Sequence, residues 1–479
     1  MFAYNFFLLI AAYHHTFDLQ LWYIAPIVFM AVVSIFDYIL LPVYILLFYI
    51  IMVFKRKKYD KETALYFTRC FWLHVFGCIA YTFVFWFIYG GGDSFGYYVG
   101  SDIIRNVLKD DPFFATYLFK SNKDIYNAVI SSGYGSKVPG SMLSNAKMML
   151  LTSFVSFPSF NFFYIISLFL SFFAFVGNWK LFYILDILNK RRYRNLTAIA
   201  VIYMPSIWFW GSGLLKESFC MGALGMIVYL LYRVLINKKI SLLKITFLAF
   251  YIYLLTIIKS YITFAFFASA GFVIFFWLMF RAKSFLIRIA SFLILVPLLI
   301  YGMSVISDTI QTMVADSLLQ IEVLKNGYER VGQEEVGSSS FKIDFELTPL
   351  GMIKKAPVVI FTCLFRPFLW ESRKVIMLFS SLEALATLLA TLYLFRMTKF
   401  FGFFKFVFND RVALFCFIYS MTFAAFVGFS TFNFGTLVRY KIMFLPFYYY
   451  MLVSIYTRYK LKVAQEKISI EETTVTMSA

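Results

Sequence analysis

Residues 242–258 read LLKITFLAFYIYLLTII, and residues 262–280 read ITFAFFASAGFVIFFWLMF. Each stretch is apolar on nearly every face of a helix and approaches the length needed to cross ~30 Å of hydrocarbon at ~1.5 Å per residue. Such a helix is not typical of a soluble domain, because the surface helices of soluble domains keep one polar face toward water. The pair therefore predicts two membrane-spanning helices joined by a tight turn at Lys259.

Apolar blocks of this kind recur along the chain. Of its 479 residues, 62% are hydrophobic and 14% are charged, whereas a soluble domain is about half apolar and about a quarter charged. With one span that ends near Lys55, the blocks predict an all-α, polytopic transmembrane helix bundle of about eleven spans, within a range of about ten to twelve. The other predicted spans lie approximately over residues 71–89, 159–178, 196–210, 219–236, 242–258, 262–280, 289–306, 376–395, 411–429 and 442–457.

The net charge of +19 comes from basic residues in short segments between these blocks. Examples are Lys55–Lys58, residues 190–194 and residues 396–405. Every second connection is basic, as the positive-inside rule requires of cytoplasmic loops. This distribution favours a topology signal over a nucleic-acid-binding patch, so no nucleic acid partner is expected. We expect a multi-pass protein of the cell inner (cytoplasmic) membrane, with the lipid bilayer as its partner.

Two long connections are predicted on the extracytoplasmic side. Gly90–Pro158 contains glycine-rich turns and aromatic stretches that are typical of short interfacial helices. Ser307–Leu350 is the most acidic part of the chain. Residues 356–370 then begin with an apolar run too short to span, which predicts a re-entrant or interfacial segment. Residues 1–457 are thus expected to form a single transmembrane domain, and residues 458–479 a disordered cytoplasmic tail.

Metal and cofactor chemistry is not indicated by the sequence. The histidines are His14, His15 and His74, and the five cysteines show no CxxC spacing. Neither pattern supplies a set of metal ligands. A glycine-rich phosphate loop is also missing from the sequence. We therefore expect no metal and no cofactor.

Charged residues beside or inside the membrane are candidates for function, because an ionised side chain at membrane depth costs at least ~2.5 kcal/mol. Asp93 follows three glycines beyond the 71–89 span, where an acid suits deprotonation of a sugar hydroxyl. Lys216 and Glu217 open a helix after Trp210–Leu215, and free N–H groups there suit an anion. The alternatives are a flexible turn with a solvated acid and a capped hairpin with a snorkelling lysine.

Further charged residues are predicted on the same side. Arg366 and Glu371 lie among aromatic residues, where an interfacial anchor is the alternative. Arg439 and Lys441 precede the last span on the side where positive charge is depleted, so a topology signal does not explain them. Lys259 is another cation on this side.

This combination predicts displacement of a lipid diphosphate by a sugar hydroxyl. Arginine binds phosphate through two parallel hydrogen bonds, and lysine adds a point charge. The predicted diphosphate-binding residues are Lys216, Lys259, Arg366, Arg439 and Lys441. The predicted catalytic acids are Asp93, Glu217 and Glu371.

Four segments resemble those of bacterial inner-membrane polysaccharide polymerases of the Wzy and EpsG type, within or near the membrane glycosyltransferases of GT-C fold. The segments are Gly92–Ser94, Trp210–Glu217, Arg366–Glu371 and Asn433–Tyr440. The resemblance implies a polysaccharide polymerase or glycosyltransferase that uses a polyprenyl-diphosphate-linked glycan on the extracytoplasmic side, without metal. It also implies an acidic catalytic residue in the first extracytoplasmic loop, which here is Asp93.

Two other classes stay open. A lipid-linked oligosaccharide flippase or transporter would carry charges inside its spans, and Asp37 and Glu383 are such residues. A non-catalytic membrane subunit of an envelope complex would need no converging charged groups.

Overall fold

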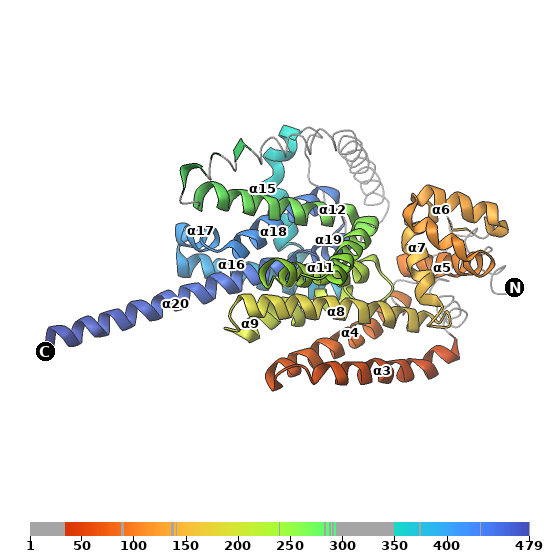
Figure 1. The fold of residues 1–479 in the computed structure, drawn as a ribbon, viewed down its shortest axis with the longest axis horizontal. Helices are drawn as coiled ribbons and strands as arrows, with labels where there is room; N and C mark the ends of the chain where they lie inside the picture. The colour runs from red at the N-terminus through yellow and green to blue at the C-terminus, as the bar shows by residue number, and fades with distance from the viewer. Residues whose placement is uncertain are drawn as a thin grey trace. The chain divides into compact units, whose positions relative to one another are not determined.

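Helices make up the regular secondary structure throughout the part of the chain that the computed structural model describes (Figure 1). The described residues are 34–87, 91–135, 138–139, 141–238, 240–281, 284–286, 289, 292–293, 349–372, 375–431 and 433–478. Among them, seven helices are long and apolar enough to cross a membrane. The expectation of an all-α, multi-pass membrane protein is confirmed to this extent.

Most of the seven candidate spans coincide with apolar blocks predicted from the sequence. Three of them are α3 (Ile35–Arg56), α4 (Lys61–Phe87) and α8 (Phe163–Leu188). The others are α11 (Lys216–Leu231) with η5 (Tyr232–Ile236), α12 (Leu242–Arg281), α16 (Val375–Thr398) and α18 (Arg411–Ser430). The predicted spans 242–258 and 262–280 both fall in α12, whose helical backbone is interrupted at Lys259 (φ −147°, ψ 81°). The non-helical backbone at Lys259 therefore separates two helices within the range of α12, at the position where the sequence predicts a tight turn.

Two regions differ from the predicted spans and tail. Residues 196–210 are divided among three short helices, α9 (Arg194–Ala198), η4 (Ile199–Tyr203) and α10 (Pro205–Trp210). Pro205 begins a new helix because it has no N–H with which to continue the previous one. At the other end of the chain, α20 (Leu445–Ser478) continues through the residues expected to form a disordered tail. The tail prediction was wrong in this respect, since the described backbone there is helical.

Some predicted segments lie partly or wholly outside the described residues, or coincide only in part with a helix. The span expected at 289–306 and the second long loop, Ser307–Leu350, lie almost wholly outside the described residues. The short segment expected at 356–370 overlaps two helices. Its first part lies in α15 (Pro349–Phe365), which contains Pro357, and its last two residues lie in η6 (Leu369–Glu371).

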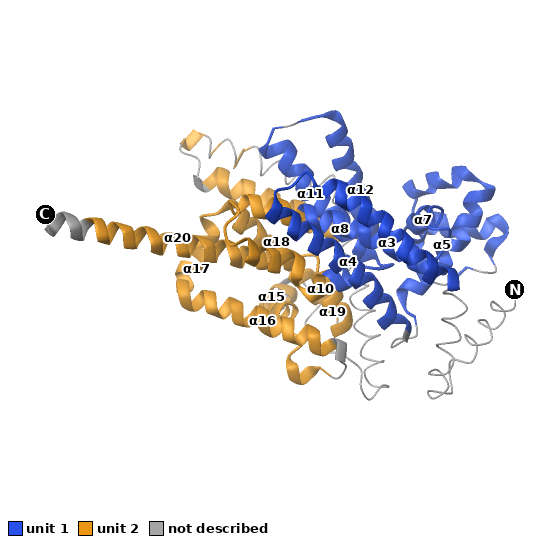
Figure 2. Ribbon diagram, turned by 90° about the horizontal axis from the view of Figure 1, so that it is seen from below, with its two compact units in different colours: residues 1–180, 208–258 blue, residues 181–207, 259–479 orange. Residues whose placement is uncertain are grey.

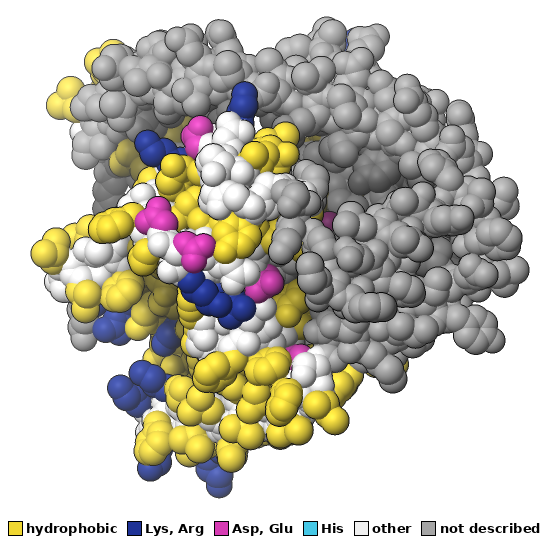
Figure 3. Space-filling model, turned by 90° about the vertical axis from the view of Figure 1, so that its right-hand side faces the viewer, with side chains coloured by type: hydrophobic (Ala, Val, Ile, Leu, Met, Phe, Trp, Pro, Cys, Tyr) yellow, Lys and Arg dark blue, Asp and Glu magenta, His cyan; other side chains and the backbone are white. Residues whose placement is uncertain are grey.

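The first long loop is itself built of helices. They are α5 (Asp93–Asp110), η1 (Pro112–Phe119), α6 (Asn122–Val129), η2 (Ile130–Tyr134) and α7 (Met142–Ser156). A side chain at Gly100 would place its Cβ 2.2 Å from the Met149 sulfur, so glycine permits the close approach of α5 and α7. Figure 3, which views the molecule from the end where these helices are drawn in Figure 1, shows acidic and basic side chains among hydrophobic ones. The short helices predicted for this loop are thus present, and their mixed surface explains why they do not form long apolar blocks in the sequence.

The chain divides into two compact units, residues 1–180 with 208–258 and residues 181–207 with 259–479 (Figure 2). In unit 1, α8 and α11 cross at glycines. A Cβ at Gly225 would lie 1.9 Å from the Gly177 carbonyl oxygen. Small residues let helix backbones approach within a membrane.

Unit 2 is built from α15, α16, α17 (Phe400–Phe408), α18, α19 (Phe434–Lys441) and α20. Its closest glycine contact is between α18 and α15, where a Cβ at Gly428 would lie 2.4 Å from Val359 Cγ1. The first part of α20 is buried, from Leu445 to Ile455, and its C-terminal part extends away from the other helices of this unit in Figures 1 and 2.

Candidate functional site

Four of the predicted cations gather around α19 in unit 2. Lys259 is 7% exposed, and its Nζ lies 3.7 Å from the centre of the Tyr440 ring. The Arg439 guanidinium lies 6.0 Å from the centre of the same ring. An ammonium within about 6 Å of a ring face is attracted to the π electrons. Two of the predicted diphosphate-binding residues, Lys259 and Arg439, thus lie beside the same ring.

The other two cations join this group through the end of α15. Arg366 lies with its guanidinium carbon 5.1 Å from the centre of the Phe434 ring, at the start of α19. Lys441, at the end of α19, donates from Nζ to the Arg366 carbonyl oxygen over 3.1 Å. We call Lys259, Arg366, Arg439 and Lys441 the cation cluster.

The start of α19 is fixed by Asn433. Its side-chain oxygen accepts hydrogen bonds from the N–H groups of Gly435 (2.8 Å) and Thr436 (3.4 Å), which satisfies two donors at the helix end. A firmly capped eight-residue helix presents Arg439 and Lys441 from a defined backbone. The Asn-x-Gly-Thr pattern in the sequence therefore has a structural role in placing the cluster.

Glu371 is held by Arg366. Arg366 Nε donates to both Glu371 carboxylate oxygens, at 3.0 and 3.1 Å, and Nη2 also pairs with Oε1. The backbone N–H of Phe368 donates to Oε2 over 2.8 Å. Partial burial raises the pKa of Glu371, but the bonds from Arg366 and Phe368 outweigh it and leave the pKa below its ordinary value. A carboxylate so engaged is a weak base, which favours a positioning role over the predicted catalytic one.

Lys441 is the most enclosed member of the cluster. Its side chain is 4% exposed, and burial lowers its pKa, with Glu383 opposing that change. Because its ammonium already bonds to the Arg366 carbonyl, Lys441 ties α19 to the end of α15. Arg366 and Arg439 are partly exposed and are better placed to meet a ligand.

The remaining predicted residues, Asp93, Lys216 and Glu217, belong to unit 1. Asp93 is exposed and opens α5 directly after Gly92, whose φ of 109° suits glycine. Lys216 and Glu217 open α11, where Lys216 is partly exposed and Glu217 is fully buried. The exposed carboxylate of Asp93 is thus the most accessible of the three predicted acids.

Tyr81 of α4 connects the two motifs that carry these residues. Its hydroxyl lies 2.8 Å from Ser94 Oγ, next to Asp93. A Cβ at Gly213, which has φ 87°, would lie 2.5 Å from Tyr81 Cδ1, so the ring packs directly on the hairpin before Lys216. Tyr81 also stacks on Phe85, with ring centres 4.4 Å apart. Sequence reasoning missed this link, because Tyr81 is one of many aromatic residues in the chain.

A buried polar network fixes the same hairpin from the other side. The Asn178 side-chain amide donates to His74 Nε2 (3.2 Å), so His74 Nδ1–H is left to donate to Ser212 Oγ (3.0 Å). Ser171 Oγ accepts from the Gly213 N–H over 2.8 Å. The signal for this network in the sequence is a histidine, His74, inside an apolar span.

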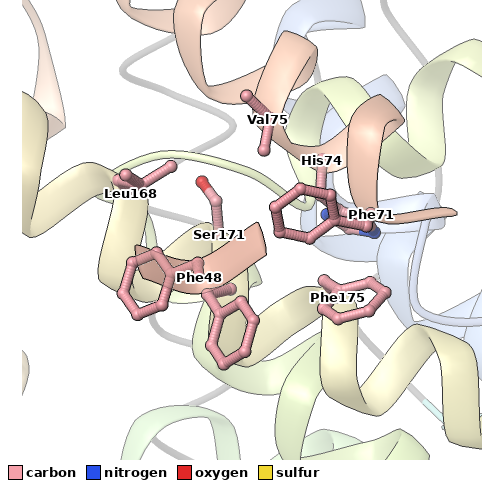
Figure 4. A pocket seen from close by; sticks show the side chains of 8 residues that line it. Phe48, Phe71, His74, Val75, Leu168, Ser171 and Phe175 are labelled. Atoms are coloured by element: carbon pink, nitrogen blue, oxygen red, sulfur yellow. The ribbon is translucent and has the colours of Figure 1, made fainter. Parts of the chain in front are cut away.

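Figure 4 shows a small pocket beside this network, lined by aromatic rings such as Phe48, Phe71 and Phe175. The polar side chains that line it are His74 and Ser171, and both already make the hydrogen bonds described above. The pocket therefore has an apolar character and offers no converging reactive groups.

The two intramembrane acids identified from the sequence have structural partners. Asp37 accepts from the backbone N–H groups of Ser34 (3.1 Å) and Tyr164 (2.9 Å). Glu383 accepts from Ser206 N (3.0 Å) and Ser206 Oγ (2.6 Å), and from the Tyr449 hydroxyl (3.4 Å). These bonds compensate for burial of a carboxylate and explain both acids without a transport pathway.

Among the described residues, no group of three or more His, Cys, Asp or Glu side chains is arranged to hold a metal ion.

No protein-family model matches the chain, and no curated protein and no solved structure matches it.

Proposed function

We propose that this protein is a membrane glycosyltransferase, of the polysaccharide polymerase kind, that uses a polyprenyl-diphosphate-linked glycan as donor. The observation that carries the proposal is the cation cluster of unit 2, in which Lys259, Arg366, Arg439 and Lys441 converge on α19. Cations gathered beside membrane helices suit a lipid-borne anion, and a diphosphate offers several oxygens to more than one of them.

In the proposed reaction, an acceptor sugar hydroxyl attacks the anomeric carbon of the donor glycan. The new bond joins the acceptor oxygen to that carbon, and the bond between that carbon and the diphosphate oxygen breaks. The polyprenyl diphosphate leaves with the bonding electron pair, and the hydroxyl proton passes to a base. Positive charge near the leaving group lowers the barrier because negative charge develops there in the transition state.

The cluster residues have different parts in this proposal. Arg439 and Arg366 supply guanidinium groups to the diphosphate, and Lys259 adds positive charge held against Tyr440. Lys441 maintains the position of Arg366 through its backbone carbonyl. Glu371 is a poor base in this arrangement, because its carboxylate is held by Arg366 and the Phe368 N–H.

The test is release of polyprenyl diphosphate by the purified full-length protein in detergent, supplied with the lipid-linked glycan of its own host. A transferase releases the diphosphate and lengthens the glycan without any sealed compartment. A flippase leaves both unchanged, as does a non-catalytic subunit. Arg439→Ala should abolish release. If every variant of the cation cluster released the diphosphate as wild type does, the assignment would be contradicted.

A further inference from the structure

Unit 2 has a second basic region, which contains none of the residues of the cation cluster. Three candidate membrane helices have an end there: α8 ends at Leu188, α16 ends at Thr398 and α18 begins at Arg411. The exposed cations beside these ends, which we call the basic surface, are Lys190, Arg191, Arg192, Lys399, Lys405 and Arg411.

One turn of α20 joins the parts of this surface. Thr457 accepts a hydrogen bond from the Asn189 side chain over 3.3 Å, and Tyr456 packs on Tyr193 with ring centres 5.1 Å apart. The next residue, Arg458, donates from Nε to Asp410 over 2.9 Å. The loop after α8 and the turn before α18 therefore meet neighbouring residues of one helix.

The same turn marks the level at which the chain leaves the apolar region. In α20, Ile455 is fully buried, whereas Arg458 and the residues after it are largely exposed and polar. A change from apolar to charged residues along a helix marks the edge of the hydrocarbon region. The change in α20 lies beside the ends of the candidate spans α8, α16 and α18, which is where lipid headgroups are expected.

Two acidic residues beside the basic surface make ion pairs with other arginines. Asp186 is paired with Arg194 over 3.0 Å, and Asp410 is paired with Arg458. Neither Arg194 nor Arg458 is part of the basic surface. Residues 189–194 and 396–411 together hold eight Lys and Arg against one Asp, so this end of the unit has a surplus of positive charge.

The loop that carries three of the cations is held in a fixed, strained conformation. Lys190, Arg191 and Tyr193 have φ of 54°, 55° and 49°, a left-handed conformation that costs roughly 1–2 kcal/mol per non-glycine residue. The Asn189 side-chain amide donates to the Arg192 carbonyl over 2.6 Å and holds the loop closed. Such strain persists only where the surroundings enforce it, and here it presents successive cations outward.

An apolar surface lies beside the cations, on α17. Phe403 and Val407 are buried against the unit, whereas Phe401 is 86% exposed and Phe400, at the start of the helix, is 60% exposed. Lys405, between them in sequence, is also exposed. A short helix with exposed aromatic rings and lysine suits the boundary between headgroups and acyl chains.

We propose that the basic surface binds the phosphate groups of anionic lipids, with Phe400 and Phe401 inserted among their acyl chains. Charge complementarity selects an anionic lipid, and the exposed phenylalanines at headgroup depth select a membrane-embedded one over a soluble phosphate. The proposal is independent of the diphosphate site, since it shares no residue with the cation cluster.

The test measures retention of phosphatidylglycerol and phosphatidylcholine by the purified full-length protein, using native mass spectrometry. We expect wild type to retain phosphatidylglycerol preferentially. Lys190→Gln combined with Lys399→Gln and Lys405→Gln should weaken that retention about tenfold or more, because each basic residue near the surface contributes to the attraction. Replacing the same three positions by arginine (Lys190→Arg, Lys399→Arg, Lys405→Arg) should preserve it.

Lys354→Gln with Lys355→Gln is the matched control, because both lysines are exposed on α15 of the same unit and outside the basic surface. The control should retain phosphatidylglycerol as wild type does. Phe401→Ser should also lower retention, while leaving competition by soluble glycerol phosphate unchanged. Equal retention of the two lipids by wild type, or an equal loss in the control, would overturn the proposal.

Discussion

Lys259 Nζ lies 3.7 Å from the centre of the Tyr440 ring, although 181 positions separate the two residues (440 − 259). Lys259 stands where the helical backbone of α12 is interrupted, and Tyr440 is near the end of α19. The contact brings a break in one helix against a short capped helix, and it places Lys259 in the same group as Arg366 and Arg439. The cluster thus depends on the interruption of α12 at Lys259 and on the capped start of α19.

The Lys259–Tyr440 contact should contribute to stability. Tyr440→Leu removes the ring face from a largely buried ammonium, and a desolvated cation–π contact is worth about 2 kcal/mol. We therefore expect a lower melting temperature for Tyr440→Leu in detergent, whereas Tyr440→Phe keeps the ring and should melt near wild type. Identical melting of the two variants would show that the ring does not stabilise Lys259.

The Arg366–Glu371 pair should give stability a specific dependence on pH. Since the folded-state pKa of Glu371 lies below its ordinary value of 4.5, its contribution is present above that value and is lost as the pH falls through the folded pKa. The difference in melting temperature between wild type and Glu371→Gln should be constant above about pH 6 and shrink as the pH falls below about 4.5. A difference that is unchanged, or that grows toward low pH, would contradict the assigned pairing.

The hairpin of unit 1 should not tolerate a side chain at Gly213. Gly213→Ala places a Cβ 2.5 Å from Tyr81 in a left-handed backbone, and we expect destabilisation of about 1–3 kcal/mol. Gly271→Ala is the matched control, because a Cβ there would meet nothing within 4 Å and alanine favours a helix. The measurement is the melting temperature of each variant. If both alanine variants have the same melting temperature, the Tyr81 contact does not constrain the hairpin.

Arg439 should require a guanidinium group. Arg439→Lys keeps the charge but loses the planar pair of donors, so we expect polymer formation to fall ~100-fold or more while protein level stays near wild type. Arg439→Ala should be at least as inactive. The readout is the amount and length of polymer in a deletion strain complemented with each variant, with Arg396→Lys as a control outside the cluster. Normal polymer from Arg439→Lys would return Arg439 to the role of an interfacial anchor.

Long apolar helices were predictable because crossing a bilayer requires a length and composition that are visible in the sequence. Residues 196–210 are apolar enough for a span, but they do not form one continuous helix, because Pro205 starts a separate helix. Short helices were predicted between Gly90 and Pro158 from turns and aromatic stretches. Their packing was not predicted, because the approach of Gly100 to Met149 joins residues that are far apart in the sequence.

The same distinction applies to the site. Unusual charges such as Arg439 and Glu383 stood out in the sequence because they lie beside or within apolar segments. Their partners did not, because Ser206 and Tyr449 around Glu383 are ordinary residues far away in the chain. The sequence therefore identified candidate residues. The fold was needed to show that Glu371 is held by Arg366 whereas Asp93 is exposed.

The central claim is that the cation cluster recognises a lipid diphosphate, and direct binding tests it most simply. The full-length protein in nanodiscs would be titrated with undecaprenyl diphosphate and, separately, with undecaprenyl monophosphate. We expect wild type to bind the diphosphate more tightly, Arg439→Lys to weaken that binding about tenfold or more, and Arg396→Lys to leave it unchanged. Equal affinity for the two lipids, with no effect of Arg439→Lys, would contradict the claim.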